Sequence, residues 1–184
     1  MTQRIPRSDP EAPLASEALL AQAERLQLAL ESAEAGLYDI DVKTGRVTCS
    51  PRYGEVFGLD VGDASVIDVS QVRALIEPED AEAIDAAARD AAATDRSWTH
   101  VVRIRRANDG ARRLVRVHGR TLSDADGIPR RSIGTVRDVT EEHEASHALA
   151  VGMRQLAEAQ RVAGIGSWEW DIATNVGGWS EQTY

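Results

Sequence analysis

The chain has 184 residues, of which 42% are hydrophobic and 28% charged, and its formal net charge is −9. This is the composition of a globular protein, and no apolar run approaches the roughly 20 residues that cross a bilayer. The N-terminus lacks the apolar stretch of a secretory signal, and the single cysteine, Cys49, excludes an internal disulfide. We therefore expect a soluble cytoplasmic protein with no membrane contact.

The first predicted element is an N-terminal helix. Residues 8–11 (SDPE) have the form of a capping box, and Gly36 marks the end. Apolar residues recur between them at heptad spacing: Leu19, Ala23, Leu26, Leu30 and Ala33. Such a stripe is typical of a helix that packs on a partner or on its own domain.

A hairpin and three helices are predicted next. Residues 36–42 (GLYDIDV) alternate as a strand does, and residues 46–49 (RVTC) return after a turn. Ser50 and Pro51 predict the start of a short helix. Residues 69–76 predict another short helix, and the Ala-rich residues 77–95 predict a longer one.

Three more strands, at residues 98–106, 111–122 and 130–138, precede a helix at 139–163. This order predicts an α+β domain in which a five-stranded antiparallel sheet carries the intervening helices on one face. Alternation puts Trp98 and Val117 on the apolar face of the sheet.

The opposite face is rich in arginine. Residues 96–137 contain eleven arginines and three acidic residues, whereas the flanks of the chain are acidic. Aromatic residues do not interleave with the arginines, and the overall charge is negative, so we expect no nucleic-acid partner. A solvated or helix-covered face is the interpretation we prefer.

The end of the chain repeats an earlier segment. Shifted by 130 residues, "VAGIGSWEWDIATNVGGWSEQTY" aligns without a gap over the first predicted hairpin, with Gly36/Gly166, Asp41/Asp171 and Thr44/Thr174 identical. A repeat of helix, glycine, strand and turn in register predicts a tandem array. We expect one complete module and the opening of a second, in a piece of a longer protein.

The segments "AGLYDIDVKTG", "SPRYGEVFGLD", "IEPEDAEAI" and "HVVRIRRANDGARRLVRVHGRTLSDADGIPRRSIGTVRDVTEE" resemble a PAS domain of the bacterial sensor type. The closing Asp-x-Thr of that family is here Asp138-Val139-Thr140. The resemblance implies a sheet that cradles a pocket. Together with the helical patterns and the repeat, it predicts four parts: an extension with an amphipathic helix at 1–25, a PAS domain at 26–138, a coiled-coil linker helix at 139–163, and the start of a second, truncated PAS domain at 164–184.

The apolar face of the predicted sheet gives the pocket candidates, and the end of its last strand gives the relay candidates. The residues expected to line a ligand pocket are Tyr38, Ile40, Trp98, His100, Val102 and Val117; for His100, a satisfied core histidine is the alternative. Asp138, Thr140 and Glu141 lie where the last strand becomes a helix, so they can cap the helix or pair with a neighbouring arginine. We expect them to relay a signal, with an inert helix cap as the alternative.

Metal and cofactor chemistry is weakly indicated. His143 and His147, in "HEASH", share a helix face and could bind zinc, but no third ligand follows the family pattern, so they are weak candidates. Haem-binding relatives use a histidine on the long helix before the third strand, and residues 81–95 contain none. Photoactive flavin relatives use a helical cysteine, whereas Cys49 is in a predicted strand. The cofactor therefore stays unknown, and haem and flavin are disfavoured.

The function we predict is a cytoplasmic sensory and dimerisation module. It binds an unknown small molecule, forms a homodimer through its N-terminal and linker helices, and relays a signal to an output domain outside this sequence. That output is predicted to be a two-component histidine kinase, with a diguanylate cyclase as the alternative. A ligand-free structural dimerisation module is a further alternative, and no reaction is assigned to these residues.

Overall fold

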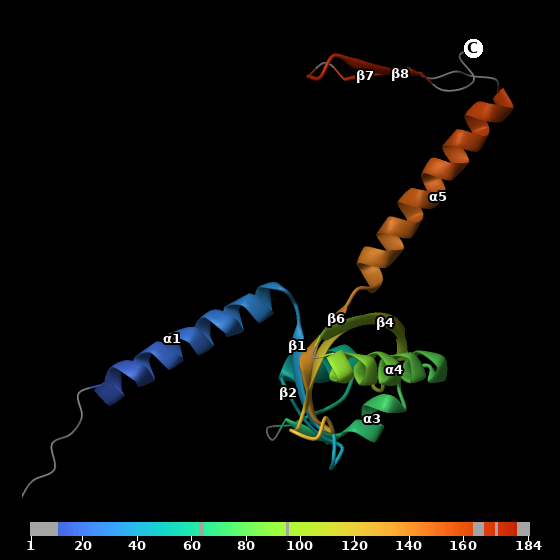
Figure 1. Cartoon of the computed structure of the whole chain (residues 1–184). Coiled ribbons are helices and arrows are strands. Elements are labelled where there is room, and N and C mark those ends of the chain that lie inside the picture. The colour runs from blue at the N-terminus through green and yellow to red at the C-terminus, as the bar shows by residue number, and fades with distance from the viewer. Residues whose placement is uncertain (1–10, 63–64, 95, 164–167, 172, 180–184) are drawn as a thin grey trace, which may run out of the picture. The chain divides into compact units, whose positions relative to one another are not determined.

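The computed structural model of the chain describes residues 11–62, 65–94, 96–163, 168–171 and 173–179. It divides into two compact units, Met1–Val139 and Thr140–Tyr184. The first unit contains the sheet and its helices, coloured from blue to yellow in Figure 1.

An antiparallel sheet of six strands forms the first unit, in the order β3-β2-β1-β6-β5-β4. The α+β class is confirmed, but the predicted count of five strands omitted one. The additional strand, β3, spans only three residues and pairs with β2 at the edge of the sheet. A strand this short shows no alternation in the sequence, so only its pairing reveals it. The strands are β1 (Gly36–Asp41), β2 (Arg46–Cys49), β3 (Val66–Asp68), β4 (Ser97–Arg105), β5 (Arg112–Ser123) and β6 (Pro129–Asp138).

Three helices cover one face of this sheet: α2 (Pro51–Phe57), α3 (Val69–Arg73) and α4 (Pro78–Thr94). The Ser50 hydroxyl caps α2 by accepting a hydrogen bond from the Tyr53 amide. A reciprocal capping box between Asp68 and Gln71 begins α3. Because α4 packs on β4 and β5 while α2 packs on β1 and β6, the core lies between the sheet and these helices.

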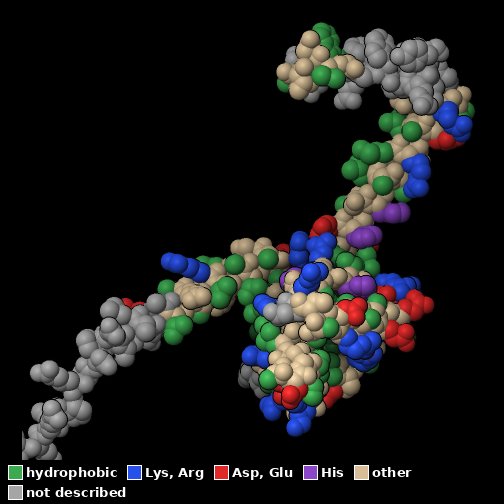
Figure 2. Space-filling model, viewed as in Figure 1, with side chains coloured by type: hydrophobic (Ala, Val, Ile, Leu, Met, Phe, Trp, Pro, Cys, Tyr) green, Lys and Arg blue, Asp and Glu red, His purple; other side chains and the backbone are tan. Residues whose placement is uncertain are grey.

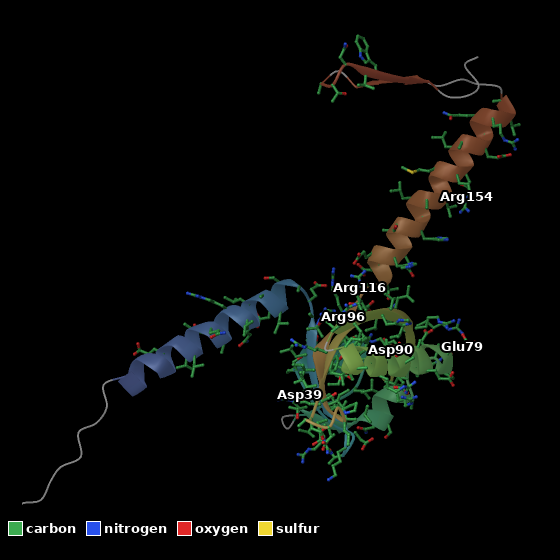
Figure 3. All side chains as sticks on the ribbon, viewed as in Figure 1. Asp39, Glu79, Asp90, Arg96, Arg116 and Arg154 are labelled. Atoms are coloured by element: carbon green, nitrogen blue, oxygen red, sulfur yellow. The ribbon has the colours of Figure 1, made fainter. Side chains whose placement is uncertain are left out.

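The two faces of the sheet differ as alternation predicted. Val102, Ile104 and Val115 are at most 1% exposed on the helix-covered face. Arginines on and around the sheet pair with acids: Arg131 with Asp39 of β1, and Arg103 with Asp80 and Glu79 at the start of α4. Figure 3 labels Asp39 and Glu79. These pairs tie adjacent strands together and fasten α4 to the edge strand β4.

The first unit also contains α1 (Glu11–Ser32). Leu19 and Leu26, two members of its apolar stripe, are 67% and 58% exposed. Most of the capping box predicted at residues 8–11 lies outside the described residues.

The second unit consists of α5 (Thr140–Ala163) and a hairpin of β7 (Trp168–Asp171) and β8 (Val176–Trp179). Trp168 pairs with Trp179 as Tyr38 pairs with Cys49, so the hairpin repeats the register of β1 and β2 after 130 residues. Asn175 has a positive φ, as Gly45 has at the equivalent turn. The internal repeat therefore extends to strand pairing. Residues 164–167, 172 and 180–184 of the predicted second module lie outside the described residues.

Candidate functional site

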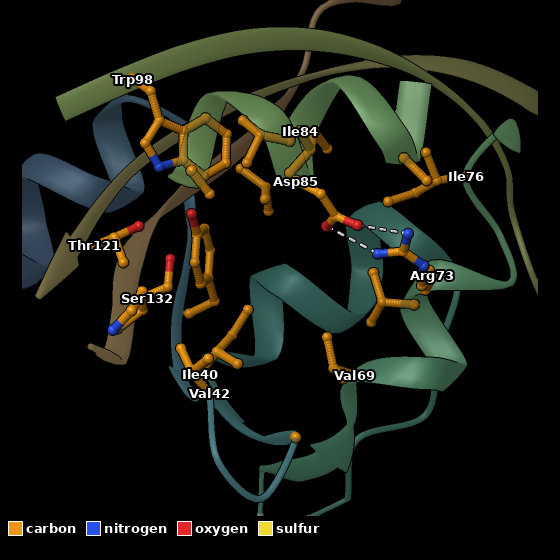
Figure 4. A pocket seen from close by; sticks show the side chains of 18 of the residues that line it. Ile40, Val42, Val69, Arg73, Ile76, Ile84, Asp85, Trp98, Thr121 and Ser132 are labelled. Carbon is orange, nitrogen blue, oxygen red and sulfur yellow. Dashed lines mark hydrogen bonds and ion pairs between the residues drawn. The ribbon is translucent and has the colours of Figure 1, made fainter. Parts of the chain in front are cut away.

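A cavity of about 370 Å³ lies between the sheet and its covering helices (Figure 4). β1, β5 and β6 form one wall with Trp98 of β4, and α2, α3 and α4 form the other. Small-molecule sites in proteins measure about 300–1,000 Å³, so this cavity is large enough for a small ligand.

Two aromatic side chains meet over a pair of glycines on the sheet side of the cavity. Strand pairing places Trp98 opposite Gly119, Gly119 opposite Gly134, and Gly134 opposite Tyr38, in one row across four strands. A Cβ atom at Gly119 would lie 2.4 Å from the Tyr38 hydroxyl and 2.7 Å from Cε2 of Trp98. Cε2 is bonded to the indole nitrogen, so the polar atoms of the two rings converge over Gly119.

A second row brings two hydroxyl groups beside the aromatic pair. Thr121 of β5 pairs with Ser132 of β6, which in turn pairs with Ile40 of β1. Figure 4 shows Trp98, Thr121 and Ser132 on the same side of the cavity. Both hydroxyl residues are buried. The sheet thus presents a small polar cluster, which we define as Tyr38, Trp98, Thr121 and Ser132.

Three atoms of this polar cluster have no hydrogen-bond partner among the described residues: the Tyr38 hydroxyl, Nε1 of Trp98 and Oγ1 of Thr121. Their residues are only 5%, 9% and 4% exposed. Burial raises the pKa of Tyr38 to about 12; the Ser132 side chain lies near enough to offset part of this rise, but not in hydrogen-bonding geometry. A buried polar group without a partner costs about 1–3 kcal/mol, so a molecule that supplied the partner would gain most here.

The helix side of the cavity is apolar, with one ion pair. Val69, Ile76 and Ile84 line this side. Arg73 donates to Asp85 in a bidentate pair with N–O distances of 2.9 and 2.6 Å, drawn as dashed lines in Figure 4. The Arg73 side chain is 50% exposed, so the pair lies where the cavity meets the surface.

Four of the six predicted pocket residues line the cavity: Tyr38, Ile40, Trp98 and Val117. His100 and Val102 are not among the described residues that line it. Both share the inner face of β4 with Trp98, but that strand is covered by α4, and Val102 is fully buried in the core. The pKa of Asp80 on α4 is lowered mainly by a hydrogen bond from Arg103, and the half-buried His100 adds a smaller effect, which places His100 near that carboxylate.

Sequence reasoning missed the hydroxyl residues Thr121 and Ser132. The available signal was their position, because each continues the inward-facing alternation of its strand. The glycines at 119 and 134 gave no signal of their own. Their role emerges only when strand pairing sets them between Tyr38 and Trp98.

The predicted relay residues lie at the exit of the sheet. Asp138, the last residue of β6, forms an ion pair with Arg113 of β5 at 3.4 Å, the kind of contact the sequence suggested. The Val139 amide donates to the Leu114 carbonyl at 2.8 Å, and the Val139 side chain is buried. Thr140 and Glu141 are the first two residues of α5. β6 is therefore fastened to β5 up to the residue before the helix.

The remaining candidate groups are Cys49 and the two histidines of α5. Cys49 is a buried free thiol in β2, and burial raises its pKa. His143 and His147 are exposed on α5, and among the described residues no cluster of three or more potential metal ligands occurs. Within the described part of the chain, every helix is too short or too polar to be a membrane span.

Comparison with known proteins bears on the sheet domain. Residues 46–136 match the family described as PAS fold. A sensory box histidine kinase/response regulator from Burkholderia thailandensis is 28% identical, with a TM-score of 0.61, over 73% of this chain and 98% of that one. The PAS domain of a protein from Colwellia psychrerythraea is 18% identical, with a TM-score of 0.50, over 65% and 98% of the two chains. No curated protein sequence matches the chain.

Proposed function

The domain that contains residues 46–136 belongs to the PAS fold family, and we propose that it is the sensory and dimerisation module of a cytoplasmic two-component signalling protein. In this proposal a small molecule occupies the cavity, and the effect reaches an output domain through α5. The 28% identical structure is named a histidine kinase/response regulator, which supports a kinase as the output.

The observation that carries the proposal is the polar cluster. A cavity that was only a packing defect, with no ligand, would be lined by apolar groups, because an unpartnered buried polar atom is destabilising. Here three such atoms line one wall of a cavity of about 370 Å³. A ligand that accepts hydrogen bonds would recover that cost and would make stability depend on occupancy.

The relay is assigned to Asp138, Thr140 and Glu141. β6 carries Ser132 of the polar cluster at one position and Asp138 at its end, so one strand joins the cavity to the exit. The Arg113–Asp138 pair and the Val139 amide bond hold that exit in one arrangement. A shift of β6 relative to β5 would alter both contacts and thereby bias the start of α5.

Dimerisation is assigned to the apolar stripes of α1 and α5. Leu149, Met153 and Leu156 on α5 are between 61% and 63% exposed, and Figure 2 shows hydrophobic side chains on the surface of this helix. A loose heptad pattern interrupted by polar residues suits a coiled coil of modest stability, which can rearrange.

The repeated hairpin at the end of the chain is interpreted as the opening of a second PAS domain.

Native mass spectrometry of the 184-residue protein as purified tests the ligand part. A bound mass that is lost in the double variant Tyr38→Phe and Thr121→Val supports a sensory cavity. A protein that carries no ligand and binds none from a metabolite library would instead favour a purely structural module.

Disulfide cross-linking tests the dimer and the relay. In a Cys49→Ala background, Leu149→Cys on the stripe should cross-link faster than Arg154→Cys, since Arg154 is next to Met153 in the sequence and so falls outside the heptad stripe. Figure 3 labels Arg154 on α5. Adding Asp138→Asn should change the rate at Leu149→Cys. Equal rates at both positions would contradict a coiled-coil seam.

A further inference from the structure

The polar cluster also indicates what kind of molecule the cavity takes. Resting on the proposed function of this cavity, we propose that its ligand is a small uncharged molecule with an apolar body and a hydrogen-bond acceptor such as a carbonyl group. Trp98, Tyr38 and Thr121 bind the acceptor, and the aliphatic side chains of α3 and α4 contact the body.

The acceptor follows from the donors. An indole N–H can only donate, whereas the hydroxyls of tyrosine and threonine can donate or accept. All three groups belong to residues that are at most 9% exposed, and none has a partner among the described residues. Trp98 and Tyr38 converge over Gly119, with Thr121 two residues along the same strand. A ligand acceptor atom can take the indole N–H together with a hydroxyl donor, whereas a ligand that only donates leaves the indole unpaired.

The absence of charge follows from the surroundings. The charged residues among those described around the cavity are Arg73, Asp85 and Arg89, all contributed by α3 and α4. Arg73 and Asp85 pair with each other, so their charges largely cancel. Tyr38 is buried deeply enough that its pKa rises to about 12, and the same desolvation penalises a carboxylate placed beside it. Arg89 is exposed on α4, and the polar cluster itself contains no charged residue, so an anion in the cluster would have no buried counter-charge.

The size and lining of the cavity describe the rest of the ligand. Its volume of about 370 Å³ is near the lower end of the ~300–1,000 Å³ range of small-molecule sites. Val72, Ile84 and Ala88 are among the aliphatic residues of the helix side. These walls match a compact hydrocarbon or single-ring body, not an extended cofactor.

Three probes of nearly the same shape separate these properties: acetophenone, α-methylstyrene and benzoate. α-Methylstyrene replaces the carbonyl oxygen of acetophenone by a methylene group, and benzoate adds a negative charge. Calorimetric titration of the 184-residue protein should give a Kd for acetophenone about tenfold below that for α-methylstyrene, the size expected for hydrogen bonds to buried donors. Benzoate should bind more weakly than acetophenone.

Variants assign the preference to the polar cluster. Trp98→Phe and Thr121→Val should each reduce the tenfold preference to about two- or threefold and leave the Kd of α-methylstyrene nearly unchanged. The matched controls are Trp170→Phe in β7 and Thr48→Val on the exposed face of β2, which should keep the full preference. Circular dichroism verifies that each variant is folded, and Thr121→Val serves if Trp98→Phe does not fold.

The outcomes separate this inference from the proposed function. Equal affinity for acetophenone and α-methylstyrene, or tighter binding of benzoate, overturns the uncharged-acceptor ligand and leaves a cavity that binds small molecules. If none of the three probes binds, the proposed ligand class is overturned, whereas the sensory role of the cavity is decided separately by the native mass spectrometry.

Discussion

The sheet domain and helix α5 place their apolar residues in opposite ways. Phe57 and Val102 of the domain are at most 1% exposed, whereas Leu149 and Met153 of α5 are 62% and 63% exposed, and no described residue of α5 is buried. Most helical stability in proteins comes from packing an apolar face, so α5 gains little from its own unit. The domain can hold a cavity with unpartnered polar groups because its core is well packed, whereas α5 lies near the low-stability end.

Truncating a large side chain in each region gives the largest contrast. Phe57→Ala should lower the free energy of unfolding by about 3–5 kcal/mol, because it removes a buried ring and leaves a hole in the core. Leu149→Ala on α5 should lower it by less than about 0.5 kcal/mol at low protein concentration, since the side chain is exposed. Urea unfolding followed by circular dichroism measures both. A Leu149→Ala effect as large as that of Phe57→Ala would show that α5 is packed on the domain.

Glycine-to-alanine substitutions should change sign between the two regions. Gly119→Ala should destabilise the domain by about 1–3 kcal/mol, because the added Cβ would lie 2.4 Å from the Tyr38 hydroxyl and 2.6 Å from the Trp98 ring. A Cβ added at Gly152 in α5 meets no atom within 4 Å apart from its neighbouring residues and the backbone of its own helix, so Gly152→Ala should stabilise the helix by up to about 1 kcal/mol. Thermal unfolding measures the domain, and far-ultraviolet circular dichroism measures the helix. Two changes of the same sign would contradict the contrast.

The same contrast explains what the sequence could predict. Alternation along one strand identified the buried face of β4 and β5, because side chains of a strand point to opposite faces with period two. The heptad stripe identified α5, because the apolar face of a helix, like that of a strand, can be recognised from a short stretch of sequence. The polar cluster was not predictable in this way. Tyr38 and Gly134 lie 96 positions apart, and Trp98 and Gly119 lie 21 apart, so their contacts depend on strand pairing that no local pattern encodes.

His100 shows a second limit of predicting pocket residues from the sequence. Alternation gave its face correctly, but its position along the sheet was decided by α4, which covers β4 and leaves the cavity over the middle strands. The face of a residue is a local property, whereas the neighbour that covers it is not. Predictions of pocket residues from one strand therefore mix residues that line the cavity, such as Trp98, with residues that pack under a helix, such as Val102.

Acid should weaken the domain more than α5. The hydrogen bond from Arg103 holds the pKa of Asp80 below its usual value, so Asp80 contributes stability that is present above about pH 4 and is lost as pH falls through the lowered pKa. Asp80→Asn should cost about 0.5–1 kcal/mol at pH 7, reduced by solvent screening of the half-exposed Arg103. The difference from the unmodified protein should shrink as the pH falls below about 4 and Asp80 becomes protonated.

Urea midpoints measured across this pH range test the prediction, with Glu158→Gln in α5 as the matched control. Glu158 pairs with Arg161 on an exposed helix surface, so its removal should change stability by less than about 0.5 kcal/mol. A difference between Asp80→Asn and the unmodified protein that stayed constant down to pH 2 would mean that the carboxylate charge is not what holds α4 to β4.

The smallest expected effect on stability concerns the boundary between the two regions. The side chains of Arg113 and Asp138 are 37% and 33% exposed, so a double-mutant cycle with Arg113→Gln and Asp138→Asn should give a coupling of about 0.5 kcal/mol. A pair this weak contributes little to the domain. Since α5 has so little packing of its own, the same change should be visible in the cross-linking rate at Leu149→Cys. If the coupling is measured but the cross-linking rate is unchanged in both single variants, the pair only fastens β6 to β5, and the proposed relay would have to use the backbone bond at Val139.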